Sequence, residues 1–416
     1  MKNISLSTAT MFLINIVFGS NLYLNTKILI SNLGDKSYYV YLFAALIIFP
    51  MVYAVAFLSS LYPGKGIYEL ISILNKNLSF PITWAYSISK IFAATISFLF
   101  GLEFLCFTFN LPKNYIYYIF TFFTFFFIWS IYKNYSLEDL IQRFISTFKF
   151  IPVLTIIVLG FFNLKKGIFF QNFFDNNFDF YQINNVLKAV PIVILSFSGF
   201  ENIFSIASNI KNPEISFKSV IYAFTSVFSI YFLYQNIISK IIPLNKIVGA
   251  NNFAEIYYLI LKKVNISDYF INILMIIASF AILGGVYNTL YANTNHIYLL
   301  LKNKNFDYSF IVFSIGLLIF FYGIFLGKNI IYTQQISSLA TITIYICVTL
   351  ICFKLSNKNF LIDLVFKTIL LFSIILIFIS IIKSISLIGY FGYLIYSLII
   401  FSGFIFILLI ERKNKI

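Results

Sequence analysis

The chain consists of long apolar runs separated by shorter polar segments. Each run holds about 20 residues, which is long enough for an α-helix to cross a hydrocarbon core about 30 Å thick. The pattern therefore predicts an all-α polytopic membrane protein with about twelve transmembrane helices. The predicted spans are Ser7–Ile30, Tyr38–Ser60, Pro81–Phe109, Tyr115–Ile131, Phe144–Phe162, Val186–Ala207, Phe217–Ile238, Tyr269–Tyr291, Ser309–Phe325, Ile331–Cys352, Val365–Ile382 and Ile388–Ile410.

An even number of spans places both chain ends on one side of the membrane. The first run has no small-residue cleavage site, so we expect a retained helix rather than a signal peptide. With the N-terminus in the cytoplasm, that side holds most of the basic residues of the short loops, as the positive-inside rule expects. These residues are Lys65, Lys76, Lys133, Arg143, Lys211, Lys218, Lys302, Lys304, Lys354, Lys358, Arg412, Lys413 and Lys415, against Lys165, Lys166, Lys262 and Lys263 on the opposite side.

No linker or charge block divides the chain, so residues 1–416 are predicted to form a single membrane domain. The two longest polar stretches, Asn163–Asn185 and Ser239–Asp268, fall on the outer side in this topology. An apolar patch at Phe253–Leu261 predicts a short surface helix within the second stretch.

The composition agrees with a membrane protein and excludes a water-soluble domain. Of the 416 residues, 61% are hydrophobic and 10% are charged, and the mean hydropathy is +0.93, whereas soluble domains contain about 25% charged residues. The net charge is +15. Because most lysines lie in short gaps between apolar runs, the lipid bilayer accounts for this charge and no nucleic-acid partner is predicted.

Few residues are suited to metal or redox chemistry. Cys106, Cys347 and Cys352 lie in apolar runs without metal-binding or redox spacing. The single histidine, His296, comes at the end of a span and is interpreted as interfacial. We therefore expect no metal, no cofactor and no enzymatic activity.

The first span contains helix-breaking residues, Phe18-Gly19-Ser20-Asn21. Such a run can unwind a helix and leave backbone N–H groups that bind a carboxylate. The same residues also suit a small-residue packing patch against a neighbouring helix, and the sequence leaves both interpretations open.

The sixth span carries Ser196-Phe197-Ser198-Gly199-Phe200-Glu201 near its middle. An intramembrane acid indicates a functional site, although Glu201 also suits a structural hydrogen bond to a neighbouring helix. The two interruptions lie five spans apart, at corresponding positions of two halves. This arrangement is typical of an inverted-repeat transporter with broken helices.

The residues at these breaks belong to segments that resemble the amino acid/polyamine/organocation superfamily of permeases. The segments are Gly19-Ser20-Asn21, Pro63-Gly64-Lys65-Gly66-Ile67-Tyr68, and Ser198-Gly199-Phe200-Glu201 followed by Lys211-Asn212-Pro213-Glu214. The resemblance extends more weakly through Leu283–Asn305. In this chain Asn21 replaces the second glycine of the first-span motif.

The resemblance also bears on the substrate. The arginine and polyamine exchangers of the superfamily carry a tryptophan six residues before the sixth-span glutamate, where this chain has Leu195. This difference argues against a guanidinium or polyamine substrate.

Lys149 in the fifth span resembles a lysine that sodium-independent members place where sodium-coupled relatives bind an ion. The resemblance implies that its ammonium group holds the first helix to the fifth and eighth helices. Without the resemblance, the residue alone favours a lysine whose side chain extends to the cytoplasmic interface.

Lys90 and Glu103 both lie in the third span. Their spacing corresponds to about 20 Å of helix rise, so they cannot pair with each other. We expect Lys90 either to extend to the interface or to face the bundle, and Glu103 to lie near the outer interface.

Together these observations predict a LeuT-like fold with a five-plus-five inverted repeat. The first repeat is residues 1–162, the second is residues 186–352, and residues 360–416 form two peripheral helices and a cytoplasmic tail. The resemblance to the superfamily implies uptake or exchange of an amino acid by alternating access, independent of sodium and possibly coupled to protons. Alternatives are a polyamine, other organocation or nucleobase transporter, a germinant-sensing relative, a lipid-linked sugar flippase and a membrane enzyme.

The two breaks supply the predicted site, because unwound helix ends present N–H and C=O groups to the two charged ends of a zwitterion. The predicted substrate-binding residues are Gly19, Ser20, Asn21, Phe197, Ser198, Gly199 and Phe200. Glu201 is expected to take part in proton coupling or in gating of the sixth helix, and Lys149 in coupling. The partners are a small-molecule substrate and the bilayer; no oligomeric state is predicted.

Overall fold

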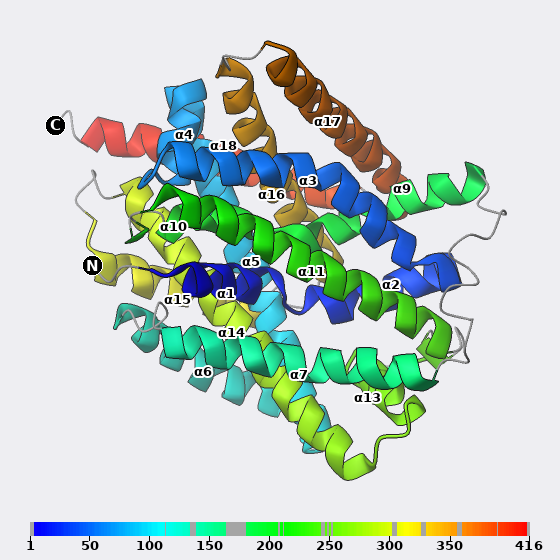
Figure 1. Ribbon diagram of the computed structural model, residues 1–416. Helices are drawn as coiled ribbons and strands as arrows, with labels where there is room; N and C mark the ends of the chain where they lie inside the picture. The colour runs from blue at the N-terminus through cyan, green and yellow to red at the C-terminus, as the bar shows by residue number, and fades with distance from the viewer. Residues whose placement is uncertain are drawn as a thin grey trace.

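The computed structural model describes residues 4–112, 114–133, 139–163, 180–206, 209–210, 212–242, 246–247, 249–250, 253–301, 306–325, 330–355, 360–388 and 390–413. These residues form one bundle of helices (Figure 1). The α-helices are α1 (Leu6–Val17), α2 (Asn21–Leu33), α3 (Tyr38–Leu61), α4 (Ile67–Leu74), α5 (Lys76–Thr108), α6 (Tyr115–Tyr132), α7 (Asp139–Asn163), α9 (Phe180–Ile194), α10 (Ile203–Ile206), α11 (Pro213–Ile241), α13 (Phe253–Lys263), α14 (Asp268–Leu301), α15 (Tyr308–Phe325), α16 (Ile330–Lys354), α17 (Phe360–Ile388) and α18 (Phe391–Lys413). Short 3₁₀ turns are η1 (Gly34–Lys36), η3 (Leu195–Phe197) and η4 (Phe200–Asn202).

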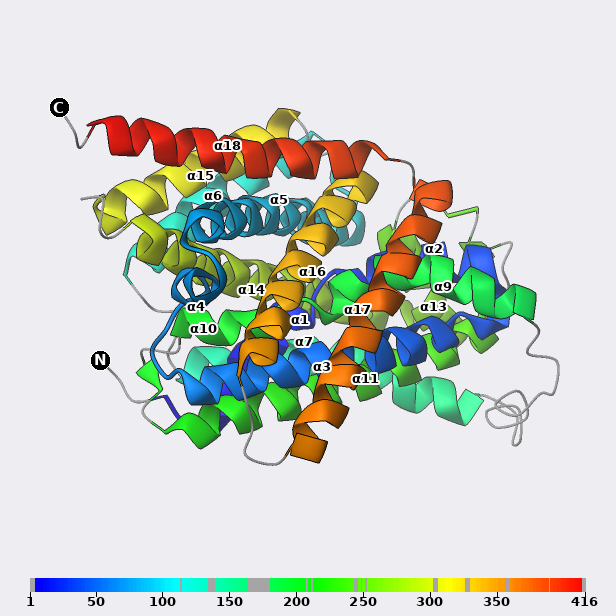
Figure 2. The ribbon, with the colours of Figure 1, turned by 90° about the horizontal axis from the view of Figure 1, so that it is seen from above.

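The predicted spans correspond to helices of the bundle. Within the described residues, nine helices are long and apolar enough to cross a membrane, and the bent pair α1–α2 forms a tenth span. The sixth and ninth predicted spans contain shorter apolar helices, Ile183–Ile194 and Tyr308–Ile324. The first described helix begins and the last described helix ends at the same end of the bundle (Figures 1 and 2).

The first span is broken where the sequence places its small and polar residues. Helix α1 begins after Ser5, whose side chain accepts a hydrogen bond from Thr8 N–H, and it ends at Phe18, where the backbone turns to an extended conformation. Helix α2 starts at Asn21. The two helices are bent by 44° at this break.

The sixth span is broken in the same way. Helix α9 continues into the turn η3, and the chain then passes through Gly199 before η4 and the short helix α10. Gly199 has a φ of +129°, which side chains disfavour, and a Cβ there would lie 2.8 Å from Val17 Cγ2. Glycine is therefore required both by the backbone and by the close approach of α1.

The Asn212-Pro213-Glu214 segment has a local structural role. The Asn212 side chain accepts a hydrogen bond from Glu214 N–H at 2.9 Å, and Pro213 occupies the first turn of α11. An asparagine cap followed by proline is a strong helix-start signal. Lys211, which completes the sequence motif, lies outside the described residues, as does the Leu195 side chain.

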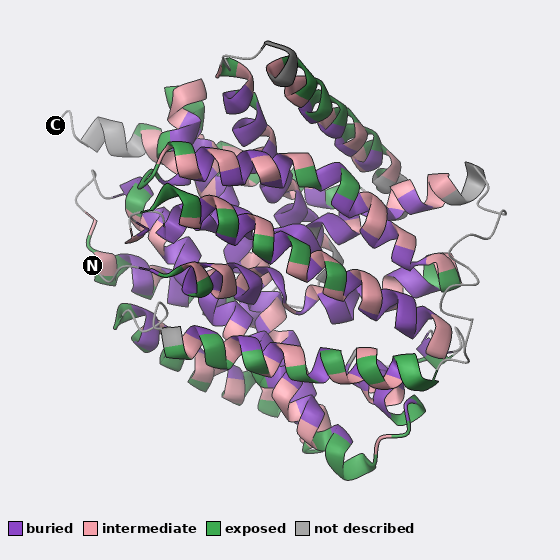
Figure 3. Ribbon diagram, viewed as in Figure 1, coloured by how far each residue is buried: buried purple, intermediate pink, exposed green. Residues whose placement is uncertain are grey.

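The bundle has a buried centre and a peripheral pair of helices. Helix α5 packs along α14 and α16, α3 packs along α11, and α1 lies against α7, α11 and α14. Of the apolar segment of α16, 72% is buried, compared with 22% for α17 and 17% for α18. Figure 3 shows the exposed residues on α17 and the outer faces of α6 and α7, where large apolar side chains suit contact with lipid.

Two short segments can be compared with the polar stretches predicted between the spans. The predicted surface helix at Phe253–Leu261 is confirmed as α13, Phe253–Lys263. Helix α9 starts at Phe180, earlier than the predicted Val186, so the outer polar stretch is partly helical. A polar side chain of this first part of α9, Asn184, accepts a 2.6 Å hydrogen bond from Lys383 of α17.

Candidate functional site

The two broken spans meet at one pocket inside the bundle. Its walls come from the α1–α2 break, the break between α9 and α10, and helices α5, α14 and α16. The lining residues at the two breaks are Gly19, Ser20, Asn21, Ser198, Gly199 and Asn202. Polar residues from the other helices are Lys90, Ser97, Thr289, Thr333, Gln334 and Ser337.

The structure places most of the predicted substrate-binding residues on this wall, but not Phe197 and Phe200. The Phe197 ring packs against the Tyr231 ring with centroids 6.0 Å apart, and both phenylalanine rings pack against Phe224. Tyr41 adds a further edge contact to Phe197. The Phe197 and Phe200 rings therefore pack against other aromatic rings and do not line the pocket.

The start of α2 gives one end of the pocket a positive character. The helix dipole favours a negative charge at the start of a helix. In α2 the Leu22 and Tyr23 N–H groups donate to the Gly19 and Ser20 carbonyls, so this dipole, together with the backbone at Ser20 and Asn21, is what the pocket presents here. Ser20 and Asn21 line the pocket at this point. The Ser20 hydroxyl lies 2.6 Å from the Ser97 hydroxyl of α5, which fixes the break against α5. This end of the pocket therefore suits a carboxylate.

Lys149 lies at the opposite side of the break, at the end of α1. Its buried ammonium group donates hydrogen bonds to the backbone carbonyls of Asn15 and Phe18. A Cβ at Gly285 of α14 would lie 2.6 Å from the Lys149 nitrogen. Lys149 thus connects α7 to α1 and lies directly against α14, and its side chain points into the bundle rather than to the interface.

A polar network beside Lys149 connects the same three helices. The Asn15 amide donates to the Gln142 side chain at 2.8 Å, and Ser146 donates to Asn15 at 3.1 Å. Gln142 and Asn288 exchange two side-chain hydrogen bonds, of 2.9 and 3.1 Å. These groups lie in the bundle core, so each satisfies a polar group that would otherwise be costly to bury.

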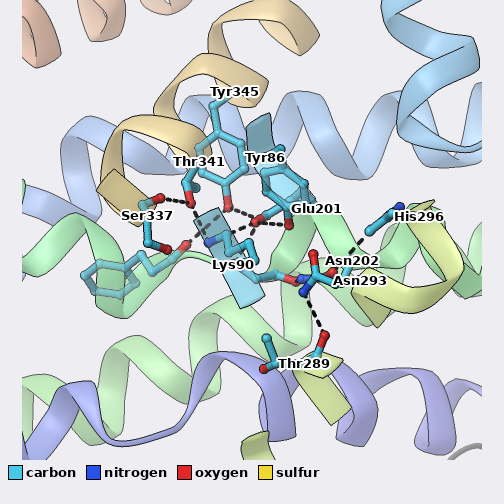
Figure 4. A network of polar contacts seen from close by, with 12 residues as sticks. Tyr86, Lys90, Glu201, Asn202, Thr289, Asn293, His296, Ser337, Thr341 and Tyr345 are labelled. Atoms are coloured by element: carbon cyan, nitrogen blue, oxygen red, sulfur yellow. Dashed lines mark hydrogen bonds and ion pairs between the residues drawn. The ribbon is translucent and has the colours of Figure 1, made fainter. Parts of the chain in front are cut away.

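Glu201 is completely buried and receives hydrogen bonds from three parts of the structure (Figure 4). Tyr86 of α5 donates to Oε1 at 2.7 Å. Gly199 N–H donates to Oε2 at 2.8 Å, and the Tyr345 hydroxyl of α16 lies 3.0 Å from the same oxygen. The carboxylate therefore ties the broken sixth span to α5 and α16.

Lys90 forms the ionic partner of Glu201. Its ammonium nitrogen lies 3.5 Å from Glu201 Oε1 and donates to Thr341 Oγ1 at 2.6 Å (Figure 4). The side chain is buried and lines the pocket. Of the two sequence interpretations of Lys90, the structure supports the one in which it faces the bundle.

His296 corrects one sequence interpretation. Its ring is buried, and its Nε2 atom lies 3.3 Å from Asn202 Oδ1. The ring also makes a T-shaped contact with the Tyr86 ring. The interfacial assignment is therefore wrong. His296 comes late in α14, but this helix continues to Leu301, and the residues of its last turns include several that are buried in the bundle.

Sequence reasoning also missed Tyr86, Thr341 and Tyr345, and it did not join Lys90 to Glu201. One signal was present: a lysine and a glutamate in two different apolar runs each need a buried partner. Because Lys149 and Glu103 also lie in apolar runs, this signal does not decide which charges pair. The tyrosines and the threonine carry no such signal, because similar residues occur throughout the spans.

The described part of the chain has no group of three or more histidine, cysteine or acidic residues that could hold a metal ion. All three cysteines are buried and reduced. The chemistry available at the pocket is therefore hydrogen bonding and charge pairing by helix ends, hydroxyls, amides and Lys90.

A multi-pass helical bundle with two broken spans around a buried polar pocket defines a transporter, not an enzyme. The sequence matches the family described as "Amino acid permease" over residues 4–411. The chain belongs to this family of the amino acid/polyamine/organocation superfamily and is a secondary transporter.

The fold is the LeuT-like one. The structure resembles the crystal structure of MhsT in complex with L-phenylalanine, with a TM-score of 0.67 and 13% sequence identity, covering 92% of this chain and 100% of that one. No curated protein matches the chain by sequence. The flippase and enzyme alternatives are excluded by the family.

Proposed function

We propose that this protein carries an amino acid across the cell membrane by alternating access, with both chain ends in the cytoplasm. The observation that supports this proposal is the meeting of the two helix breaks at one pocket. A helix N-terminus and the unwound sixth span present opposite partial charges at one depth, which is the pattern that a zwitterion needs.

In the proposed complex, the α-carboxylate of the substrate meets the backbone N–H groups around Gly19, Ser20 and Asn21. The α-amino group meets carbonyl groups of the sixth-span break around Phe197, Ser198 and Phe200. Ser198 is the member of this set on the pocket wall, whereas the Phe197 carbonyl already lies 3.2 Å from the Tyr345 hydroxyl. Ser198 is therefore the preferred contact.

We propose further that transport is independent of sodium. The ammonium group of Lys149 binds the carbonyl oxygens of Asn15 and Phe18 at the end of α1. Carbonyl oxygens are typical ligands of a hard cation, so a positive charge is already supplied at this position. Protons are the proposed coupling ion, with Glu201 as their carrier.

The test is uptake of radiolabelled amino acids into proteoliposomes in sodium-free buffer, with the twenty amino acids and common polyamines as competitors. Competition by at least one amino acid without sodium is expected. Inhibition by polyamines or nucleobases alone would show that another substrate class of the superfamily is carried. An absolute requirement for sodium would remove the proposed role of Lys149.

A further inference from the structure

Lys90 gives the pocket a charged group at the end remote from the α2 N-terminus. Ser97, which contacts Ser20, and Lys90 both line the pocket from α5 and are seven positions apart. Seven residues correspond to about 10 Å of helix rise. A substrate whose α-carboxylate lies at Ser20 therefore directs its side chain along α5 towards Lys90.

The Lys90 ammonium group retains capacity to bind a ligand. It has three N–H donors, and the described residues provide two oxygen acceptors, Thr341 at 2.6 Å and Glu201 at 3.5 Å. Glu201 itself has shorter hydrogen bonds from Tyr86 and Gly199. Lys90 can therefore turn towards a ligand without leaving Glu201 unsatisfied.

Two further polar groups line the pocket from α16. The Gln334 amide nitrogen and the Ser337 hydroxyl are buried and have no hydrogen-bond partner among the described residues. Ser337 lies one turn before Thr341, the residue that Lys90 contacts, whereas Gln334 lies seven positions before Thr341 (Figure 4). The Ser337 hydroxyl is therefore the group near Lys90 that is available to a ligand.

An ammonium group and a hydroxyl together match the two oxygens of a carboxylate. Among the described residues that line the pocket, Lys90 is the one that carries a charge, because Glu201 is not part of the pocket wall. A second ammonium group would meet Lys90 in a poorly solvated site and be repelled.

We propose that Lys90 determines specificity, and that the substrate is an amino acid with a side-chain carboxylate, which binds to Lys90 and the Ser337 hydroxyl. This inference rests on the proposed function and deepens it. Amino acids with cationic side chains and polyamines are rejected by the same residue.

The test compares competitors of uptake by the full-length protein in proteoliposomes: L-glutamate and L-aspartate, their amides L-glutamine and L-asparagine, L-leucine and L-lysine. The acidic amino acids are expected to compete at concentrations at least about tenfold below those of the amides, because a charged hydrogen bond is lost in the amides. L-lysine should be weaker by a factor on the order of 100.

Lys90→Met should reduce the ratio between acid and amide to about one, because the charge that distinguishes them is gone. Since this change leaves Glu201 without its ionic partner, the double variant Lys90→Met with Glu201→Gln provides a second test in which no buried charge is unpaired. Because Glu201 is the proposed proton carrier, the double variant is read by equilibrium competition for binding, which needs no transport step. Lys367→Met is the matched control, because Lys367 also pairs with an acid, Asp363 at 2.7 Å, but on the peripheral helix α17. It should keep the wild-type ratio.

The inference is overturned if the amides compete as well as the acids in the wild type, or if the preference for acids persists in both Lys90 variants. These results leave the proposed function intact. If no amino acid competes at all, the proposed function itself is wrong, together with this inference.

Discussion

At the scale of single residues, Glu201 is an acid in the interior of the bundle. It is fully buried, and it is held by donors from α5, α16 and its own break, as a buried acid requires. A proton that neutralised it would weaken its attraction to Lys90 and the hydrogen bonds that keep the sixth span in place. The proposed role of Glu201 in proton coupling or gating rests on this argument.

Glu201→Gln keeps the size of the side chain but cannot exchange a proton. We expect it to flatten the dependence of the uptake rate on pH, because the variant has no carboxyl proton to exchange. The measurement is initial uptake into proteoliposomes as a function of external pH. A variant that retains the wild-type profile shows that the proton is carried elsewhere, with Lys149 as the next candidate, or that no proton step exists.

Gly199 and Gly19 provide a matched pair of glycines at the two breaks. A Cβ at Gly199 would approach Val17 and Ile16 at 2.8 and 2.9 Å with an unfavourable φ, whereas a Cβ at Gly19 meets nothing within 4 Å. Gly199→Ala should lower the free energy of unfolding by about 1–3 kcal/mol, and Gly19→Ala should leave it nearly unchanged. Thermal unfolding of the two purified variants checks this, and equal stabilities would contradict the close approach of α1 to the sixth span.

At the scale of elements, Lys149 joins helices that must separate during alternating access. Lys149→Ala leaves the carbonyls of Asn15 and Phe18 without their donor, but it does not touch the pocket wall. Transport should fall much more than substrate affinity.

Gly285→Ala tests the same contact between helices from the side of α14, because the added methyl group would displace the Lys149 ammonium group. It should reproduce the transport defect. Both variants are compared by initial uptake rate and by equilibrium binding of the best competitor. A parallel loss of binding and transport in Lys149→Ala would place Lys149 in the binding site instead of between the helices. Binding is judged on this variant alone, because Gly285 itself lines the pocket.

The elements also show which parts of the structure a sequence reveals. The spans, both breaks and helix α13 depend on local composition, such as the apolar run that starts at Phe253 or the small residues at Gly19-Ser20. The pairing of Lys90 with Glu201 depends on which spans pack together, so no local pattern contains it. The early start of α9 likewise involves a contact to Lys383, far away in sequence.

At the scale of the whole molecule, the predicted topology distinguishes the two ends of the bundle. Lys65, between α3 and α4, and Asn265, between α13 and α14, are both exposed, and the predicted topology places them on opposite sides of the membrane. The native cysteines Cys106, Cys347 and Cys352 are buried.

Lys65→Cys and Asn265→Cys should therefore be distinguished by a membrane-impermeant thiol reagent applied to intact cells. Only Asn265→Cys is expected to react, since the positive-inside rule places Lys65 in the cytoplasm. Labelling after permeabilisation controls for access to both sites. Reaction of Lys65→Cys alone in intact cells would invert the topology.

The two halves of the molecule, residues 1–162 and 186–352, are proposed to act as repeats that move around a fixed central pocket. Each contributes one broken span to that pocket, so substrate binding is the event that engages both. The proposed transport mechanism therefore depends on where the substrate binds.

Gly19→Leu measures this most directly. The Gly19 Cβ position opens into space at the pocket wall, so a leucine side chain can be accommodated by the fold while occupying the place proposed for the substrate. Equilibrium binding of the radiolabelled amino acid that competes best is measured in sodium-free buffer for the wild type and for this variant, after both are shown to be monodisperse and equally stable. We predict saturable binding to the wild type and none to Gly19→Leu; unchanged affinity in the variant would contradict the placement of the substrate between the two helix breaks.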